Sequence, residues 1–326
     1  MAFKKLGEDK IINGTRILVY GEAGTRKTRF AMSFPKNAYI NADQGGDDYY
    51  EEFADNLVMV SDSITFSEVL EDVDEIEANL DEIDTITIDS WTKIYENQQH
   101  VALKVVEQRA RKNGRLVEGE GLSQKEWGVI KLNAEKLASK LLGFKRDGKT
   151  VIIIAEGKDE TETIVDAQGN TSRKKIGITP NAQKDFDFDF DIVLEMVRDP
   201  KTKKTLGARV IKDRLGVTEE GEIIENPTYE IWADAIERKR QGTKKAEKKN
   251  FEKSLKEDEA SFTADTEGAQ AEKVKNEIFS IINSSSKDAQ KKIREAFTEK
   301  FGDPKFNIID DVEKLKEYLE VAKSVK

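Results

Sequence analysis

The sequence predicts an α/β fold in which helices flank a mostly parallel central sheet, followed by a small helical module at the C-terminus. Three observations support this prediction. Short β-branched strands alternate with helical segments through most of the chain, which is the pattern of parallel sheets. A glycine-rich loop joins the first of these strands to a helix. Helical periodicity returns at the C-terminus after a polar stretch.

The first strand is expected at residues 15–20, a β-branched and aromatic run that ends in glycine, and the helix after the loop at 27–34. The strongest apolar run, 150–155, is expected to be a buried strand. Helices are expected over 65–83 and over 91–145, the second interrupted by a loop at 112–122. Other expected strands lie at 38–42, 57–60, 85–89, 191–197 and 207–212, with a hairpin over 160–178 that turns at 166–170.

Composition divides the chain into a core at 1–237, a linker at 238–269 and a helical domain at 270–326. The core is expected to close near Trp232 or Ile236. The linker is rich in lysine and then acidic, with few apolar residues to bury. Beyond it, apolar residues at helical spacing indicate a module of three helices.

Residue counts exclude several kinds of chemistry. The 326 residues include no cysteine, which excludes disulfides and thiolate metal sites, and a single histidine, His100. A net charge of −10 gives no overall attraction to nucleic acid, so a polyanion would need a local basic patch. No apolar run reaches the length of a membrane span, and the N-terminus lacks the apolar stretch of a signal peptide. We therefore expect a soluble cytoplasmic protein that does not contact membranes.

One loop matches the phosphate-binding pattern G-x-x-x-x-G-K-[ST] at all but one position: Gly21-Glu22-Ala23-Gly24-Thr25-Arg26-Lys27-Thr28, followed by Arg29. Glycines let backbone amides turn inward around phosphates, the lysine neutralises them, and the Thr28 hydroxyl ligates Mg²⁺. Arg26 stands where the pattern has glycine, although Gly24 adds a flexible point. A strand before the loop and a helix after it are the context that this mechanism requires. We expect the loop to bind ATP with Mg²⁺; the alternative is an ordinary glycine turn or a degenerate loop.

Asp89 ends an apolar strand and has the position of the acid that orients Mg²⁺ in phosphate-loop ATPases. An aspartate at such a place can instead cap the next helix, a role for which Ser90 is equally suited. Taken with the loop, the pattern predicts a Mg²⁺ site formed by Thr28 and Asp89.

A residue that positions the attacking water is expected at the end of a neighbouring strand. Asp43, within the segment 41–46, is the first candidate, and Asp47 and Asp48 compete with it. The alternative is an acidic surface turn. Because aspartate is shorter than the glutamate usual at such sites, hydrolysis is expected to be slow.

The phosphate-binding motif, the strand that ends at Asp89 and several other segments occur in an order that resembles the RecA-like phage P-loop nucleotide-binding proteins of the AAA family. The resemblance is in particular to the short RecA-core ATPases that anneal single strands, the fourth Sak group. The resemblance covers about residues 13–236. It implies a RecA-like core and, for a phage protein, the cytoplasm of the host cell. Two positions depart from the pattern: Glu156, where a polar residue such as histidine is common, and Arg26. The resembling segments are 20–28, 30–35, 40–46, 86–90 and 151–156, with Asp191 and 212–214.

The resemblance also implies a role for Lys212 and Arg214, which follow a late strand. They look like the cation pair that RecA-like motors insert into the ATP site of the neighbouring subunit, where it stabilises charge on the transferring phosphoryl group. That role implies a homo-oligomer, either a ring or a filament. The residues alone favour a solvated basic turn, and the resemblance shifts the preference to the cation pair.

Two segments are locally basic. Residues 104–115 carry five lysines and arginines against one glutamate, and residues 238–256 carry nine against two glutamates. Such clusters contact phosphates and make binding salt-dependent. Neither has interleaved aromatic residues on which bases would stack. The alternatives are a solvated helix face for the first segment and a flexible charged linker for the second.

We therefore expect an ATP-binding and slowly ATP-hydrolysing RecA-like protein that binds single-stranded DNA and promotes annealing or strand pairing in DNA recombination. One alternative is an ATPase that loads or remodels replication proteins, such as a single-strand binding protein, without touching DNA. Another is a nucleotide-gated scaffold with little turnover. The expected catalytic residues are Lys27, Asp43, Asp89, Lys212 and Arg214.

Overall fold

The computed structural model describes residues 11–114, 121–165, 171–242, 244–245, 267–302, 305–309 and 311–325. The chain forms two compact units, residues 1–248 and 249–326. Most of the predicted linker, residues 246–266, lies outside the described residues. Helix α5 (Ala233–Arg240) extends past the predicted end of the core at 237. Beyond it, β11 (Lys244–Lys245) pairs in parallel with β1 (Ile11–Ile12).

A nine-stranded sheet forms the centre of the first unit within the described residues. Its strands are β2 (Thr15–Gly21), β3 (Asn37–Asn41), β4 (Leu57–Ser61), β5 (Thr85–Asp89), β6 (Thr150–Val165), β7 (Thr171–Pro180), β8 (Ile192–Arg198), β9 (Thr205–Asp213) and β10 (Ile223–Ile224). Their order is β10-β9-β8-β2-β6-β5-β3-β4, with β7 paired to β6 beside this path. From β8 to β4 each strand runs parallel to its neighbour in this order. The pairs β6–β7, β8–β9 and β9–β10 are antiparallel. The predicted mostly parallel sheet is confirmed.

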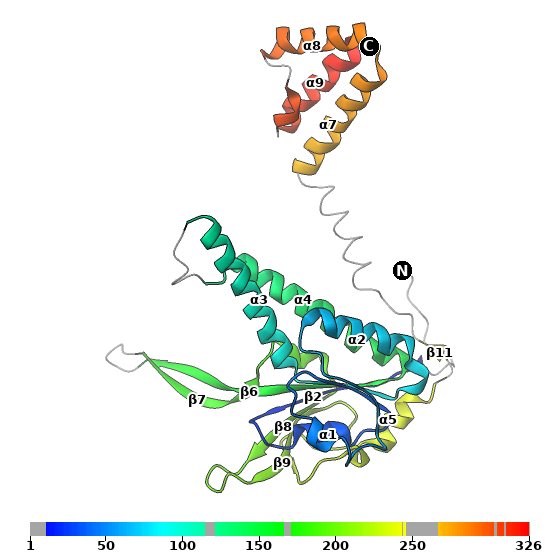
Figure 1. The fold of residues 1–326 in the computed structure, drawn as a ribbon, viewed down its shortest axis with the longest axis vertical. Coiled ribbons are helices and arrows are strands. Elements are labelled where there is room, and N and C mark those ends of the chain that lie inside the picture. Colours follow the sequence, from blue (N-terminus) through cyan, green and yellow to red (C-terminus); the bar gives the residue numbers. More distant parts are fainter. Residues whose placement is uncertain are drawn as a thin grey trace. The chain divides into compact units, whose positions relative to one another are not determined.

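Helices cover both faces of this sheet (Figure 1). Helices α1 (Lys27–Met32) and α5 lie on one face. The other face carries α2 (Phe66–Ala78), α3 (Trp91–Lys112) and α4 (Gln124–Gly143). Short 3-10 helices complete the described secondary structure at Asp47–Tyr49, Leu80–Glu82, Phe144–Asp147, Phe186–Asp189, Tyr229–Ile231 and Phe306–Ile308.

The central strand β2 separates two apolar cores. Ile17 and Val19 pack on the side of α1, whereas Leu18 and Tyr20 pack on the side of α2. The two sets alternate because successive side chains of a strand point to opposite faces. A strand buried on both faces is mostly apolar, as the run from Ile17 to Tyr20 is, and this run predicts the strand at 15–20.

Helices α2 and α4 begin at capping boxes. The Thr65 hydroxyl accepts a hydrogen bond from the backbone N–H of Glu68, whose carboxylate accepts one from the backbone N–H of Thr65. Ser123 and Glu126 repeat the arrangement at α4. Part of the predicted loop between α3 and α4, residues 115–120, lies outside the described residues.

The second unit packs α7 (Glu267–Ser284), α8 (Lys287–Phe301) and α9 (Val312–Val325) around a separate core. The Tyr318 ring stacks on Phe301, with 3.9 Å between ring centroids, and meets Phe297 edge-on at 4.9 Å. These helices form the predicted C-terminal helical module. In the described parts of both units, no helix is both long and apolar enough to cross a membrane.

Candidate functional site

The loop between β2 and α1 depends on two glycines. Gly21 has φ 145° and Gly24 has φ 68°, in the region that glycine alone adopts without strain. A Cβ on Gly21 would lie 2.5 Å from the carbonyl oxygen of Met196, because β8 runs beside β2 at this point. The loop can therefore turn sharply against the neighbouring strand only with glycine at position 21.

Arg26 occupies the position where the phosphate-binding pattern has glycine, and its backbone is left-handed, with φ 70°. A side chain at such a φ carries strain. The guanidinium of Arg26 donates a hydrogen bond of 2.7 Å to the side-chain oxygen of Asn226. The loop thus keeps the backbone conformation that glycine favours, with an arginine held at its flank.

Lys27 lies across the loop. Its Nζ donates hydrogen bonds to the carbonyl oxygens of Gly21, at 3.0 Å, and Glu22, at 2.8 Å. Burial lowers the pKa of Lys27, while the negative charges of Asp89 and Glu156 oppose that shift. The lysine is thus placed where a phosphate in the loop would meet its ammonium group.

Asp89 lies beneath the loop at the end of β5, and its carboxylate is buried. One of its oxygens accepts hydrogen bonds from the Thr28 hydroxyl, at 2.7 Å, and from the Tyr39 hydroxyl, at 2.6 Å. Burial raises the pKa of Asp89 to about 6, and the charge of Asp43 adds to this shift. The structure therefore brings together Thr28 and Asp89, the two residues expected to bind Mg²⁺.

Asp43 follows β3 and is exposed. Its backbone N–H donates a hydrogen bond of 3.1 Å to the carbonyl oxygen of Asp89, and its carboxylate accepts one from Gly45. Of its two competitors, Asp47 accepts a hydrogen bond from Asn41 at 2.6 Å. Asp43 is therefore the acid anchored directly to the end of β5.

The Arg29 side chain leaves the loop. It forms an ion pair with Glu52, and its guanidinium lies over the rings of Tyr49 and Phe53, 5.4 and 5.5 Å from their centroids. The backbone of Arg29 belongs to the first turn of α1, beside the loop, but its side chain is directed to Glu52. The expectation that Arg29 binds the nucleotide gains no support from its side chain.

Lys212 and Arg214 lie at the amino end of the parallel strands, whereas the loop lies at their carboxyl end. Lys212 is in register with Val193 near the start of β8, whereas Gly21 is in register with Met196 near its end. The antiparallel direction of β9 causes this placement. Neither cation is therefore positioned to serve the phosphate loop of its own chain.

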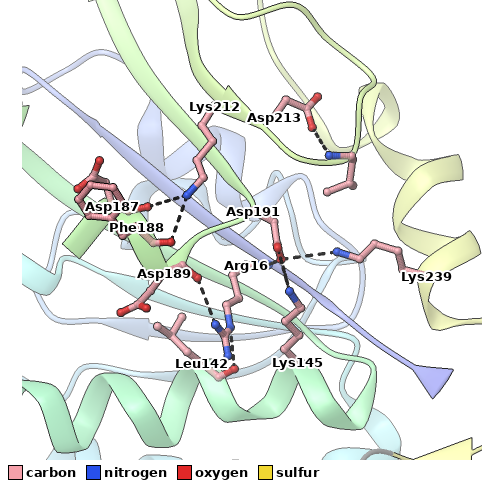
Figure 2. A network of polar contacts seen from close by, with 11 residues as sticks. Arg16, Leu142, Lys145, Asp187, Phe188, Asp189, Asp191, Lys212, Asp213 and Lys239 are labelled. Carbon is pink, nitrogen blue, oxygen red and sulfur yellow. Dashed lines mark hydrogen bonds and ion pairs between the residues drawn. The ribbon is translucent and has the colours of Figure 1, made fainter. Parts of the chain in front are cut away.

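Figure 2 shows the polar contacts around Lys212 at this end of the sheet. The Nζ of Lys212 donates to the carbonyl oxygens of Asp187 and Phe188, each at 3.2 Å. The carboxylate of Asp191 accepts hydrogen bonds of 2.8 Å from Lys145. The backbone N–H of Arg214 donates to the carbonyl oxygen of Asp191, at 2.8 Å, so Lys212 and Arg214 are both anchored to the segment 187–191.

Three residues near the loop are not part of the sequence motif. Tyr39 lies in an apolar strand, and Asn226 meets Arg26 across 200 positions. Arg198 ends β8, one residue beyond the strand expected at 191–197. Its place at the carboxyl end of a strand is the feature that could have singled it out, since ligands of parallel sheets bind at that edge.

The groups at this edge fit a magnesium nucleotide. Gly21 and Gly24 leave a cradle of backbone that side chains would fill, and Lys27 sets a cation across it. Thr28 and Asp89 supply hydroxyl and carboxylate oxygens, the ligands that Mg²⁺ prefers. The arrangement can therefore hold phosphates against backbone amides with a divalent cation beside them.

Comparison with known families agrees with this geometry. Residues 13–225 match the family model described as AAA domain, a match that includes the loop, Asp43 and Asp89. The match to this family indicates a nucleotide-binding ATPase domain. No curated protein matches the chain.

Proposed function

We propose that this chain, which belongs to the AAA domain family, binds and hydrolyses ATP at residues 21–28. The observation that carries the proposal is the 2.7 Å hydrogen bond from the Thr28 hydroxyl to the Asp89 carboxylate. It joins the two oxygen groups that would hold Mg²⁺ directly to the loop. When bound, Mg²⁺ neutralises charge on the phosphates.

Lys27 and Asp43 have separate roles in this proposal. Lys27 binds the phosphates as a cation, since its Nζ already bridges the loop carbonyls of Gly21 and Glu22. Asp43 orients the attacking water and accepts its proton. The hydrogen bond from its backbone to Asp89 and its exposed carboxylate support that role. The short side chain is the reason to expect slow hydrolysis.

The proposal extends to single-stranded DNA and to annealing or strand pairing in phage recombination. Lys104, Arg111 and Lys112 are exposed on α3, which projects from the sheet with α4 (Figure 1). Cations on a projecting helix can reach a phosphate backbone without obstruction from the core. The other basic segment falls mostly outside the described residues.

Assembly into a ring or filament is part of the same proposal. Lys212 and Arg214 lie away from the phosphate loop of their own chain, at the other end of the sheet. In a head-to-tail arrangement, that edge would meet the phosphate loop of the next copy. The two cations would then act on the neighbour's ATP.

A nucleotide-gated scaffold with little turnover is the second candidate function. The observation that favours it is the left-handed backbone of Arg26 at φ 70°, in a position where other phosphate loops have glycine. A strained loop can bind ATP and still hold it in a geometry that hydrolyses slowly. An ATPase that loads replication proteins without touching DNA would share the site but not the DNA response.

The test is phosphate release from ATP and Mg²⁺, with and without single-stranded DNA, for the intact chain and for Lys27→Ala. Release that DNA stimulates and that Lys27→Ala abolishes supports the recombination ATPase. Release that DNA does not change supports the loading ATPase. ATP binding without release supports the scaffold, and no binding by the intact chain refutes the proposal.

A further inference from the structure

Arg198 is placed beside the phosphate loop by the sheet. Met196 of β8 is in register with Gly21 at the end of β2, so Arg198 continues past the point where the loop begins. The turn that follows is braced, because the carboxylate of Asp199 accepts hydrogen bonds from the backbone N–H groups of Lys201 and Thr202. Arg198 is thus held at a defined position by a strand and a tight turn.

The guanidinium of Arg198 lies directly against the loop. A Cβ on Gly24 would lie 2.7 Å from its Nη2 atom, which is closer than a Cβ normally approaches another heavy atom, so the guanidinium would have to shift. Glycine at position 24 therefore has a second function besides its φ of 68°, since it leaves room for the arginine. The close approach of Arg198 to Gly24 brings the end of β8 against the middle of the phosphate-binding loop.

Arg198 has no partner for its charge among the described residues. Its Nε is buried without a hydrogen-bond acceptor there, and no ion pair in the described parts of the chain includes it. Arg209 on the next strand differs, because it donates to Glu195 at 2.8 Å. A buried donor without an acceptor costs free energy, and an anion bound in the loop would supply the acceptor.

We propose that Arg198 is a phosphate-binding cation that acts in cis, on the nucleotide held by the loop of its own chain. A guanidinium presents paired N–H donors that match the oxygens of a phosphate. This inference rests on the proposed ATP site and adds to it a second cation besides Lys27. It also gives one copy of the chain a phosphate-binding arginine that does not depend on assembly.

The electrostatics of Lys27 agree with this assignment. The charge of Arg198 acts together with burial to lower the pKa of Lys27. Two cations that face the same small space repel each other, and a polyphosphate would relieve that repulsion. The contacts of Arg198 with Gly24 and of Lys27 with Gly21 and Glu22 place both cations at the same loop.

Binding measurements test this inference without any turnover. Calorimetry would give the dissociation constants of ATP and of inorganic tripolyphosphate for the intact chain, Arg198→Gln and Arg198→Lys. We expect Arg198→Gln to weaken both ligands by about tenfold to a hundredfold, as for the loss of a charged hydrogen bond, and to reduce the salt dependence of binding. Arg198→Lys should retain part of the affinity. Lys201→Gln removes an exposed charge from the adjacent turn and should leave both constants unchanged.

Gly24→Ala provides an independent test through the other partner. The added methyl group should displace the guanidinium and weaken ATP binding in the intact chain. In the Arg198→Gln background it should weaken binding less, because the displaced group is already gone and only the strain of alanine at φ 68° remains. Thermal unfolding of each variant checks that the fold persists.

The outcomes separate this inference from the function on which it rests. If the intact chain binds ATP and a folded Arg198→Gln variant binds it equally well, Arg198 has no such role and the ATP site stands. Equal losses from Arg198→Gln and Lys201→Gln would likewise overturn the inference. If the intact chain binds no ATP, the proposed function fails and this inference fails with it.

Discussion

The hydroxyl of Thr28 donates a hydrogen bond of 2.7 Å to the carboxylate of Asp89, which lies 61 positions further along the chain. The contact joins the start of α1 to the end of β5, with β6 between β5 and the strand that leads to the loop.

Asp89→Asn should lower phosphate release about a hundredfold or more, because an amide cannot provide the charge that a magnesium site requires. The folding stability should be retained, since an amide oxygen can still accept the hydrogen bonds of Thr28 and Tyr39. Phosphate release and thermal unfolding are the two measurements. Full activity in the folded variant would rule out Asp89 as a Mg²⁺ ligand.

Gly21→Ala should destabilise the first unit by about 2–3 kcal/mol, because the new Cβ would meet the carbonyl oxygen of Met196 at 2.5 Å and the φ of 145° does not suit alanine. Gly128→Ala is the matched control. Gly128 lies inside α4 with open space around it, so alanine there should stabilise the protein by about 0.5–1 kcal/mol. Urea unfolding at neutral pH compares them, and shifts of the same sign would contradict the prediction.

Two substitutions of Arg26 separate strain from hydrogen bonding. Arg26→Gly and Arg26→Ala both lose the contact with Asn226, but only glycine relieves the left-handed φ of 70°. The glycine variant should therefore be more stable than the alanine variant by about 1 kcal/mol. Chemical denaturation measures the difference. If both unfold at the same denaturant concentration, the backbone of Arg26 is not strained.

Asp191→Asn should cost about 3 kcal/mol at pH 7, because it leaves the lysines at 2.8 Å (Lys145) and 3.6 Å (Lys239) without their shared partner. Burial alone would raise the pKa of Asp191, but the hydrogen bond and charge of Lys145, aided by Lys239, lower it below its ordinary value.

The sign of the pH dependence follows from that lowered pKa. The ionised carboxylate stabilises the fold above its unfolded pKa, near 4, and this stabilisation is lost as the pH falls through the lower folded pKa. The difference between the intact chain and Asp191→Asn should thus be full at pH 7 and shrink below about pH 4. Urea unfolding at several pH values measures it, and a difference that stays constant in acid would argue against the ion pair.

Mixing two inactive variants tests the role of Lys212 in a neighbouring subunit. Lys27→Ala lacks the phosphate-binding lysine but keeps Lys212, whereas Lys212→Ala has the reverse defect. If Lys212 acts on the next copy, mixed assemblies should recover part of the phosphate release, because some interfaces combine an intact loop with an intact Lys212. Each variant alone, at the same total concentration, is the control. No recovery in verified mixed assemblies would leave Lys212 with its contacts to Asp187 and Phe188 as its whole role.

In the segment 185–191, the sequence pattern does not correctly predict which phenylalanine side chains are buried. Phenylalanine alternates with aspartate there, which predicts an edge strand or a turn with Phe186 and Phe188 on one buried face. The structure has the turn, a short 3-10 helix at Phe186–Asp189, but not the buried face that the pattern predicts. Phe186 and Phe190 are buried, whereas Phe188 is 67% exposed. Phe186 stacks on Trp91 of α3, a distant contact that an alternating pattern does not encode.

Short-range periodicity predicts the strands from the sequence alone, and a motif of adjacent residues predicts the phosphate-binding loop. An acid at the end of an apolar strand makes Asp89 a candidate magnesium ligand. Three further relationships appear only in the folded chain: Tyr39 shares the carboxylate of Asp89 with Thr28, Arg198 lies against Gly24, and Lys212 lies at the other end of the sheet from the loop. These relationships follow from the order and direction of strands in the sheet. That order is set by pairing between segments distant in sequence, and the pattern within each segment does not specify its neighbour.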